Sequence, residues 1–171
     1  DRTIIGCAQP KVFGGFNNTF SYKNFDLNVN TIFSLGNDVY NGTRVMMENM
    51  QGSSNMFASV VNHWTESNQN AAFPRPLRSK AVMRVSDQYV ENGSYFRFQN
   101  ITLGYNVPTD FLSFTKYVSA LRVYASLQNF FTITSYSGDN PEVSKYGQDN
   151  LGAGYDAFSY PFAKSVLFGL N

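Results

Sequence analysis

The chain has 171 residues, a formal net charge of +1 and only 15% charged side chains, below the ~25% of an average soluble domain. So weak a charge excludes a role built on attraction to nucleic acid or to an anionic membrane surface. Cys7 is the only cysteine, which excludes an internal disulfide, and no apolar run reaches the ~18 residues of a membrane-spanning helix.

The first predicted elements are two strands, at residues 13–22 and 25–35. Aromatic and aliphatic side chains alternate with polar ones along both, and side chains of a strand alternate between its two faces. A two-residue turn at 23–24 pairs Tyr22 with Phe25 and, further along, apolar with apolar and polar with polar residues. The pattern therefore predicts a hairpin with one apolar and one polar face.

Three further strands are predicted at residues 95–106, 120–131 and 161–171. In the first of them, the aromatic residues before the pair 99–100 and the aliphatic residues after it fall on opposite parities. A bulge at this pair reconciles the two halves, because one extra residue reverses the phase. In the last strand, Leu167 is the one apolar residue on the polar parity.

The connections alternate between short ones, at 23–24 and 107–119, and long ones, at 36–93 and 132–160. All short turns then lie at one end of an up-and-down sheet and all long loops at the other, which is the layout of outer-membrane barrels. Ten residues at ~3.3 Å each and ~45° tilt rise about 24 Å, close to the apolar band of such barrels. A soluble β-sandwich with the aromatic residues in its core, such as a carbohydrate-binding or adhesin module, is the alternative that periodicity leaves open.

The first long loop has elements of its own. Residues 43–50 and 56–64 are predicted as short helices on either side of a Gly-Ser-Ser-Asn linker. A loop of this length in a compact domain is typical of a functional or a covering segment.

Several stretches carry a family resemblance. They are YVENGSYFRFQNITLGYNVP (89–108), LRVYASLQNFFT (121–132), YSGDNPEV (136–143), FGLN (168–171), DRTIIG (1–6), PK (10–11), GFNNT (15–19), GNDVYN (36–41) and Arg75 within FPR (73–75). In this order and spacing they resemble the late barrel of SusC-like TonB-dependent transporters. The resemblance runs nearly from end to end of the chain.

The resemblance implies an all-β fold: antiparallel up-and-down strands that form part of a large transmembrane β-barrel of about 22 strands. The chain is expected to be the C-terminal part of that barrel, at 1–171, with the plug domain and the TonB-contacting segment before Asp1. The given sequence contains no signal peptide and starts abruptly at Asp1, as we expect of a piece of something longer.

The resemblance also implies partners, place and direction. On this resemblance, a SusD-like surface lipoprotein caps the outer face of the barrel and the TonB complex drives transport. The expected cargo is in the first place an oligosaccharide, and in the second a peptide. The location is the outer membrane of a Gram-negative bacterium of the Bacteroidetes type, with barrel strands in contact with lipid. The turns at 23–24 and 108–119 are then periplasmic, and the loops at 36–93 and 132–160 extracellular.

Catalytic patterns are absent from the sequence. His63 is the only histidine and has no second ligand at metal spacing. The glycine-rich stretch 147–154 lacks the Gly-Lys-Ser/Thr of a phosphate-binding loop. We therefore expect no enzyme activity, no cofactor and no metal ion.

Ligand contact in the outer loops is the more plausible chemistry. Aromatic rings stack on sugar rings, while carboxylate, amide and guanidinium groups bind sugar hydroxyls. The candidates for these roles are Trp64, Arg75, Tyr136, Asp139, Asn140, Tyr146 and Tyr155. The alternative is that these side chains pack the loops against each other or against the lipoprotein.

The polar face of the strands is expected to face a wet, plugged lumen and the apolar face lipid. The lumen-facing candidates are Asn17, Asn28, Asn30, Arg122, Tyr124 and Gln128.

Overall fold

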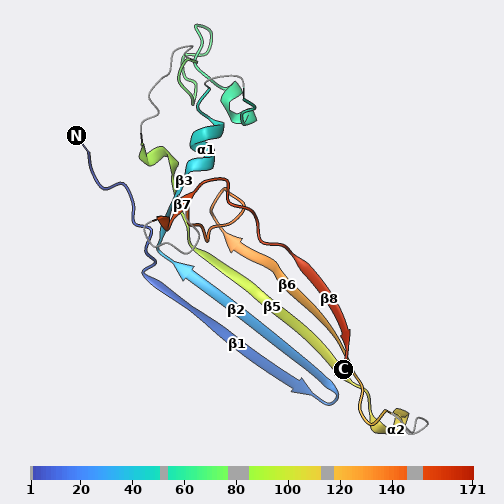
Figure 1. The fold of residues 1–171 in the computed structure, drawn as a ribbon. Coiled ribbons are helices and arrows are strands. Elements are labelled where there is room, and N and C mark those ends of the chain that lie inside the picture. The colour runs from blue at the N-terminus through green and yellow to red at the C-terminus, as the bar shows by residue number, and fades with distance from the viewer. Residues whose placement is uncertain (1, 51–53, 77–84, 113–117, 146–151) are drawn as a thin grey trace.

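The computed structural model describes residues 2–50, 54–76, 85–112, 118–145 and 152–171. Within these ranges, five strands form one antiparallel sheet in the order β1-β2-β5-β6-β8 (Figure 1). Their bounds are Val12–Tyr22 for β1, Phe25–Leu35 for β2, Tyr95–Asn106 for β5, Arg122–Thr134 for β6 and Ser165–Leu170 for β8. The sheet therefore has the predicted up-and-down antiparallel arrangement.

β1 and β2 form a hairpin in the register that the alternation predicts. Tyr22 lies opposite Phe25 and Thr19 lies opposite Asn28, so each face keeps one chemical character. Lys23, in the two-residue turn, has a φ of 52°, a left-handed conformation that matches the twist of hairpin strands.

The predicted bulge in β5 lies at Gln99. Phe98 pairs with Thr31 and Asn100 pairs with Asn30, so the ladder skips Gln99. This extra residue reverses the alternation. The aromatic residues before Gln99 therefore share a face with the aliphatic residues after it.

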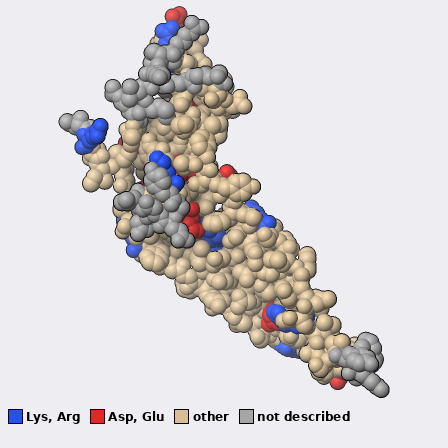
Figure 2. All heavy atoms as spheres, in the orientation of Figure 1, with Lys and Arg blue, Asp and Glu red and all other residues tan. Residues whose placement is uncertain are grey.

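One face of the sheet is apolar and, in the described part of the chain, uncovered. Phe16 is 58% exposed and Phe168 is 81% exposed, and many aliphatic and aromatic neighbours on this face are also open. On the side of the molecule that Figure 2 shows, most of the surface along the strands is uncharged, with small groups of acidic and basic atoms. A soluble protein covers such a face with a second layer. The described residues supply no such layer, so the structure does not favour the soluble β-sandwich.

The long loops build what we call the loop lobe, the described residues of 36–93 and 135–164. It lies beyond one end of the strands (Figure 1). Its elements are β3 (Asp38–Asn41), α1 (Gly42–Met47), two 3₁₀-helices (Ala58–Val61 and Asp87–Tyr89), β4 (Val90–Asn92) and β7 (Tyr155–Asp156). The strands among them form a second sheet in the order β4-β3-β7. Val39, Tyr136 and Val143 form a buried apolar cluster that joins the two loops.

The opposite end of the sheet carries the short connections. The turn at 23–24, the short helix α2 (Thr109–Leu112) and the end of the chain lie there (Figure 1). Short turns and long loops are thus separated, as the connection lengths predict.

Some elements are shorter or longer than predicted. α1 ends at Met47 rather than at residue 50, where Met50 adopts a left-handed φ of 53°. The helix predicted at 56–64 is a single 3₁₀ turn, because Val60, Val61 and Asn62 are poor helix formers. β6 runs on to Thr134, three residues past the predicted end. β8 begins at Ser165 instead of residue 161, where proline has no N–H for a ladder.

No helix among the described residues combines the length and the hydropathy needed to cross a membrane.

Candidate functional site

The loop lobe contains a cavity of about 650 Å³, within the size range of small-molecule sites. It lies between the start of α1, the turn at 137–139 and the segment 156–161. Its lining residues are Asn41, Thr43, Arg44, Phe57, Ser137, Gly138, Asp139, Asp156, Phe158, Ser159, Tyr160 and Pro161. Both long loops therefore contribute to a single hollow, which we call the loop cavity.

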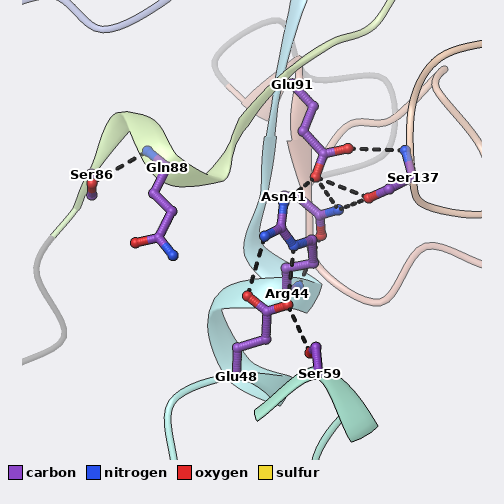
Figure 3. Close-up of polar contacts among 8 residues, drawn as sticks. All are labelled: Asn41, Arg44, Glu48, Ser59, Ser86, Gln88, Glu91 and Ser137. Carbon is purple, nitrogen blue, oxygen red and sulfur yellow. Dashed lines mark hydrogen bonds and ion pairs between the residues drawn. The ribbon is translucent and has the colours of Figure 1, made fainter. Parts of the chain in front are cut away.

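One wall of the loop cavity is a polar network centred on Arg44 (Figure 3). The Arg44 guanidinium donates to both carboxylate oxygens of Glu48, at 3.3 Å each, and to Glu91 at 2.7 Å. Glu91 also accepts hydrogen bonds from the backbone N–H and the hydroxyl of Ser137, at 2.9 Å each. Ser59 donates to Glu48 at 3.3 Å. The network thus ties the second long loop to three elements of the first.

Asn41 connects this network to the start of α1. Its side-chain oxygen accepts the backbone N–H of Arg44 at 2.9 Å, as an N-cap residue does. Its amide donates to Glu91 and to Ser137, at 3.2 Å each. One buried amide therefore fixes both the helix terminus and the carboxylate that holds Arg44.

Burial and hydrogen bonding act on Glu91 in opposite directions. Partial burial disfavours its charged form. The donors Arg44, Ser137 and Asn41 outweigh this effect and hold the pKa of Glu91 below its ordinary 4.5. Glu91 is therefore an anion at neutral pH, and its charge is part of the fold of the lobe.

The other wall is held by the buried carboxylate of Asp156. It accepts hydrogen bonds from the hydroxyl of Thr43 at 3.2 Å, from the backbone N–H of Ser159 at 3.0 Å and from the hydroxyl of Tyr136. Burial, together with the hydrogen bond to Asp156, raises the pKa of Tyr136 far above its ordinary value of 10. The phenol therefore remains a donor at all physiological pH values.

The rim of the loop cavity is aromatic and acidic. Phe57, Phe158 and Tyr160 are exposed there, and so is the carboxylate of Asp139. Phe158 has a φ of 58°, a left-handed conformation that costs a non-glycine residue about 1–3 kcal/mol. Its backbone N–H is held by the hydroxyl of Thr43 at 2.8 Å. Strain of this kind is concentrated at functional sites.

A second anchor, Arg97 of β5, attaches the 139–143 turn to the sheet. Arg97 is only 3% exposed and donates to Glu142 at 2.9 Å, to Asn140 at 3.0 Å and to Thr132 at 3.2 Å. Its guanidinium carbon lies 4.5 Å from the ring centroid of Phe162. A cation enclosed in this way positions the loop and is not available to a ligand.

The structure separates the predicted ligand residues. Asp139 lies on the rim of the loop cavity. Tyr136 and Asn140 are buried and make hydrogen bonds within the lobe, and Tyr155 stacks on Tyr40 with ring centroids 5.5 Å apart. The structure thus shows these three side chains in contacts within the lobe.

Trp64 and Arg75 lie elsewhere in the first long loop. Trp64 is half-buried and its backbone N–H donates to the carbonyl of Phe73, while Arg75 is exposed. Neither is among the residues that line the loop cavity. Tyr146 lies outside the described residues.

Sequence reasoning missed Arg44, Ser137 and Phe158. Arg44 has the pattern of an ordinary solvated helix residue, and only the fold reveals its two carboxylate partners. Asn41 did carry a signal, since it stands two residues before the predicted helix 43–50 and asparagine is a typical N-cap.

The six lumen-facing candidates lie on one face of the sheet. Across the sheet, Asn17 lies opposite Asn30, Asn30 lies opposite Asn100, and Asn100 lies opposite Gln128. Asn28, Tyr124 and Arg122 have the same parity along their strands. Arg122 forms an ion pair with Asp26 on this face. The register therefore gathers polar side chains on the face opposite Phe16 and Phe168.

Among the described residues, no group of three His, Cys, Asp or Glu side chains is placed to hold a metal ion. The ring of His63 contacts the carbonyl of Val60 at 3.0 Å through Nδ1. Most of the glycine-rich stretch 147–154 lies outside the described residues.

No protein-family model matches the chain. Curated proteins do match it over its full length. The chain is 40% identical to the TonB-dependent receptor P3 of Formosa agariphila and 34% identical to the TonB-dependent receptor SusC of Bacteroides thetaiotaomicron. It spans only 17% and 16% of these two proteins, respectively.

Solved structures match the fold. Two structures of the RagAB peptide importer, in its closed-closed and open-open states, have TM-scores of 0.80 and 0.76 and identities of 26% and 25%. The alignments cover 98% and 95% of this chain and 18% and 17% of the matched chains.

Proposed function

We propose that the chain is a segment of a SusC-like TonB-dependent receptor and serves in the import of an oligosaccharide across an outer membrane. The observation that carries the proposal is the single-layered sheet of the described residues, with its apolar face open and its long loops at one end. Such a sheet needs lipid on one face and further strands at its edges.

In this proposal the five strands are the C-terminal part of a barrel of about 22 strands, with the plug supplied by residues before Asp1. The apolar face meets lipid. The polar face, with Asn17, Asn28, Asn30, Arg122, Tyr124 and Gln128, meets the lumen, where these side chains contact the plug or line the route. The loop lobe is extracellular, and the turns at 23–24 and 108–119 are periplasmic.

The proposed partners follow from the same family. A SusD-like lipoprotein covers the loop lobe, and the TonB complex acts through the plug region. The organism is a Gram-negative bacterium of the Bacteroidetes type, as are the sources of the matched curated receptors. The relatives are receptors and importers by name, and we propose no enzymatic role.

The cargo is the part of the proposal that needs the most direct test, because one matched structure is of a peptide importer. An oligosaccharide fits better the aromatic and hydroxyl-rich lining of the loop cavity. Among the candidates from the sequence, Asp139 is our first choice as a ligand contact, because it lines the loop cavity. Trp64, Arg75 and Tyr146 are proposed as further contacts from the same loops.

The test is uptake by cells that express the whole receptor containing this chain together with its lipoprotein. We expect fluorescently labelled oligosaccharides to accumulate in the periplasm, and accumulation to stop when the TonB gene is deleted or a protonophore is added. Oligopeptides with the same label, tested in the same cells, are the comparison. If only peptides are taken up, the proposed cargo is wrong and is a peptide instead. Uptake that is independent of TonB would contradict the transport proposal.

A further inference from the structure

We propose that the loop cavity binds an uncharged stretch of oligosaccharide and discriminates against sugars that carry sulfate or carboxylate groups. This inference rests on the proposed function and specifies that the transported sugar carries no charge. It is argued from the loop cavity and from the charges of the described residues around it.

The cation in the wall of the loop cavity is already neutralised. All three kinds of nitrogen in the Arg44 guanidinium donate to carboxylates, Nε and Nη2 to Glu48 and Nη1 to Glu91. An anionic ligand would have to compete with two fixed carboxylates at 2.7–3.3 Å. Arg44 therefore contributes shape to the loop cavity but no net attraction for an anion.

The remaining charges of the lining are negative. Among the described residues that line the loop cavity, Asp139 and Asp156 are acidic and Arg44 alone is basic. Glu48 and Glu91, the partners of Arg44, add two further carboxylates to this part of the structure. Lys164 and Arg97 line a neighbouring hollow that Asp139 also borders, and Arg97 is ion-paired with Glu142. Anions close to such a set are repelled, most strongly where water is partly excluded.

Asp139 is the group that a ligand would meet first. It is exposed, and its side chain makes no hydrogen bond or ion pair with another described residue. A free carboxylate accepts two hydrogen bonds from neighbouring hydroxyl groups, which uncharged sugars supply in adjacent pairs. A sulfate or a uronate offers acceptors in the same place, and two acceptors cannot pair.

Aromatic rings complete the site. Phe57, Phe158 and Tyr160 stand exposed around the opening, and the apolar faces of sugar rings pack on such surfaces. Phe158 is held in its left-handed conformation by Thr43, which fixes the position of one ring before a ligand arrives. Preorganisation of this kind lowers the entropic cost of binding.

The experiment measures binding to the whole receptor, purified in detergent. One probe is a pool of uncharged hexasaccharides prepared from starch, cellulose, xylan and mannan, and the other is the same pool after chemical sulfation. We expect the wild type to bind the uncharged pool at least tenfold more tightly than the sulfated one. Asp139→Lys should strengthen binding of the sulfated pool about fivefold and weaken binding of the uncharged pool, because the charge at the rim is reversed.

Glu66→Lys is the matched control, since it makes the same charge change at an exposed loop position outside the loop cavity. It should leave the ratio of the two affinities within twofold of the wild type. The inference is overturned by equal or tighter binding of the sulfated pool to the wild type, by no binding of either pool, or by the same ratio in Asp139→Lys and Glu66→Lys. If one of these results is found while the cells still take up sugar in a TonB-dependent way, the proposed function stands. Only the inference that the cargo is uncharged is then overturned.

Discussion

The sheet and the loop lobe of this chain are stabilised in different ways. In the sheet, backbone ladders join the strands, and one face has aromatic and aliphatic side chains with nothing over them in the described structure. In the loop lobe, ladders are only two to four residues long, and buried polar side chains such as Asn41, Glu48 and Asp156 join the loops. The sheet therefore depends on its surroundings, whereas the lobe depends on its own hydrogen bonds.

The largest expected effect tests the surroundings of the sheet. Val29→Arg in the whole receptor should cost about 2–4 kcal/mol of folding free energy, because an arginine would face the lipid near the middle of a strand. Asn28→Arg, its neighbour on the opposite face, should cost much less. Refolding titrations into lipid vesicles measure both. Equal costs would contradict the assignment of the two faces.

The next effect tests the attachment of the lobe to the sheet. Arg97→Leu should detach the 139–143 turn and cost about 2 kcal/mol, since several hydrogen bonds from a buried cation are lost. Hydrogen exchange should quicken in this turn and stay slow in the ladder of β1 and β2. Faster exchange throughout the sheet would show instead that Arg97 supports the barrel wall.

A smaller effect tests the polar network inside the lobe. Glu91→Gln should cost about 1 kcal/mol, because a charged acceptor of Arg44 and Ser137 becomes a neutral amide. The wild type should also lose lobe stability in acid. The folded pKa of Glu91 is lowered, so its contribution is present above pH 4.5 and is lost as the pH falls through the folded value.

Hydrogen exchange at Ser137, followed from pH 7 to pH 3 and corrected for intrinsic rates, measures this loss. In Glu91→Gln the acid-dependent part should shrink, while the β1–β2 ladder serves as an internal reference. If the variant shows the same increase of exchange in acid, the loss of stability comes from protonation of another carboxylate.

The smallest effect concerns the partly exposed pair of Arg122 and Asp26, at the end of the sheet away from the lobe. Arg122→Leu should lower the free energy of unfolding less than any of the other variants, since such pairs gain little over their hydration. The same refolding titration measures it. A cost equal to that of Arg97→Leu would mean that the plug or another element buries the pair.

Sequence reasoning predicted the sheet far better than the site. Alternation specifies a strand face directly, so the register of Tyr22 with Phe25 and the bulge at Gln99 follow from the pattern. The loop cavity does not follow from any local pattern, because its walls join residues about a hundred positions apart, such as Asn41 and Ser137. Tyr136 and Asn140 have the residue types of ligand contacts, yet only the fold shows that Asp156 and Arg97 already bind them.

The bulge at Gln99 has a further consequence for how the chain tolerates length changes. Arg97 and Ile101 have the same parity in the sequence, yet the extra residue places them on opposite faces. Deleting Gln99 would therefore leave a regular strand with both halves on their present faces, whereas deleting a residue elsewhere in β5 would invert one half relative to the other. We expect length variation among homologous β5 strands to occur at this position and to be absent from the rest of the strand.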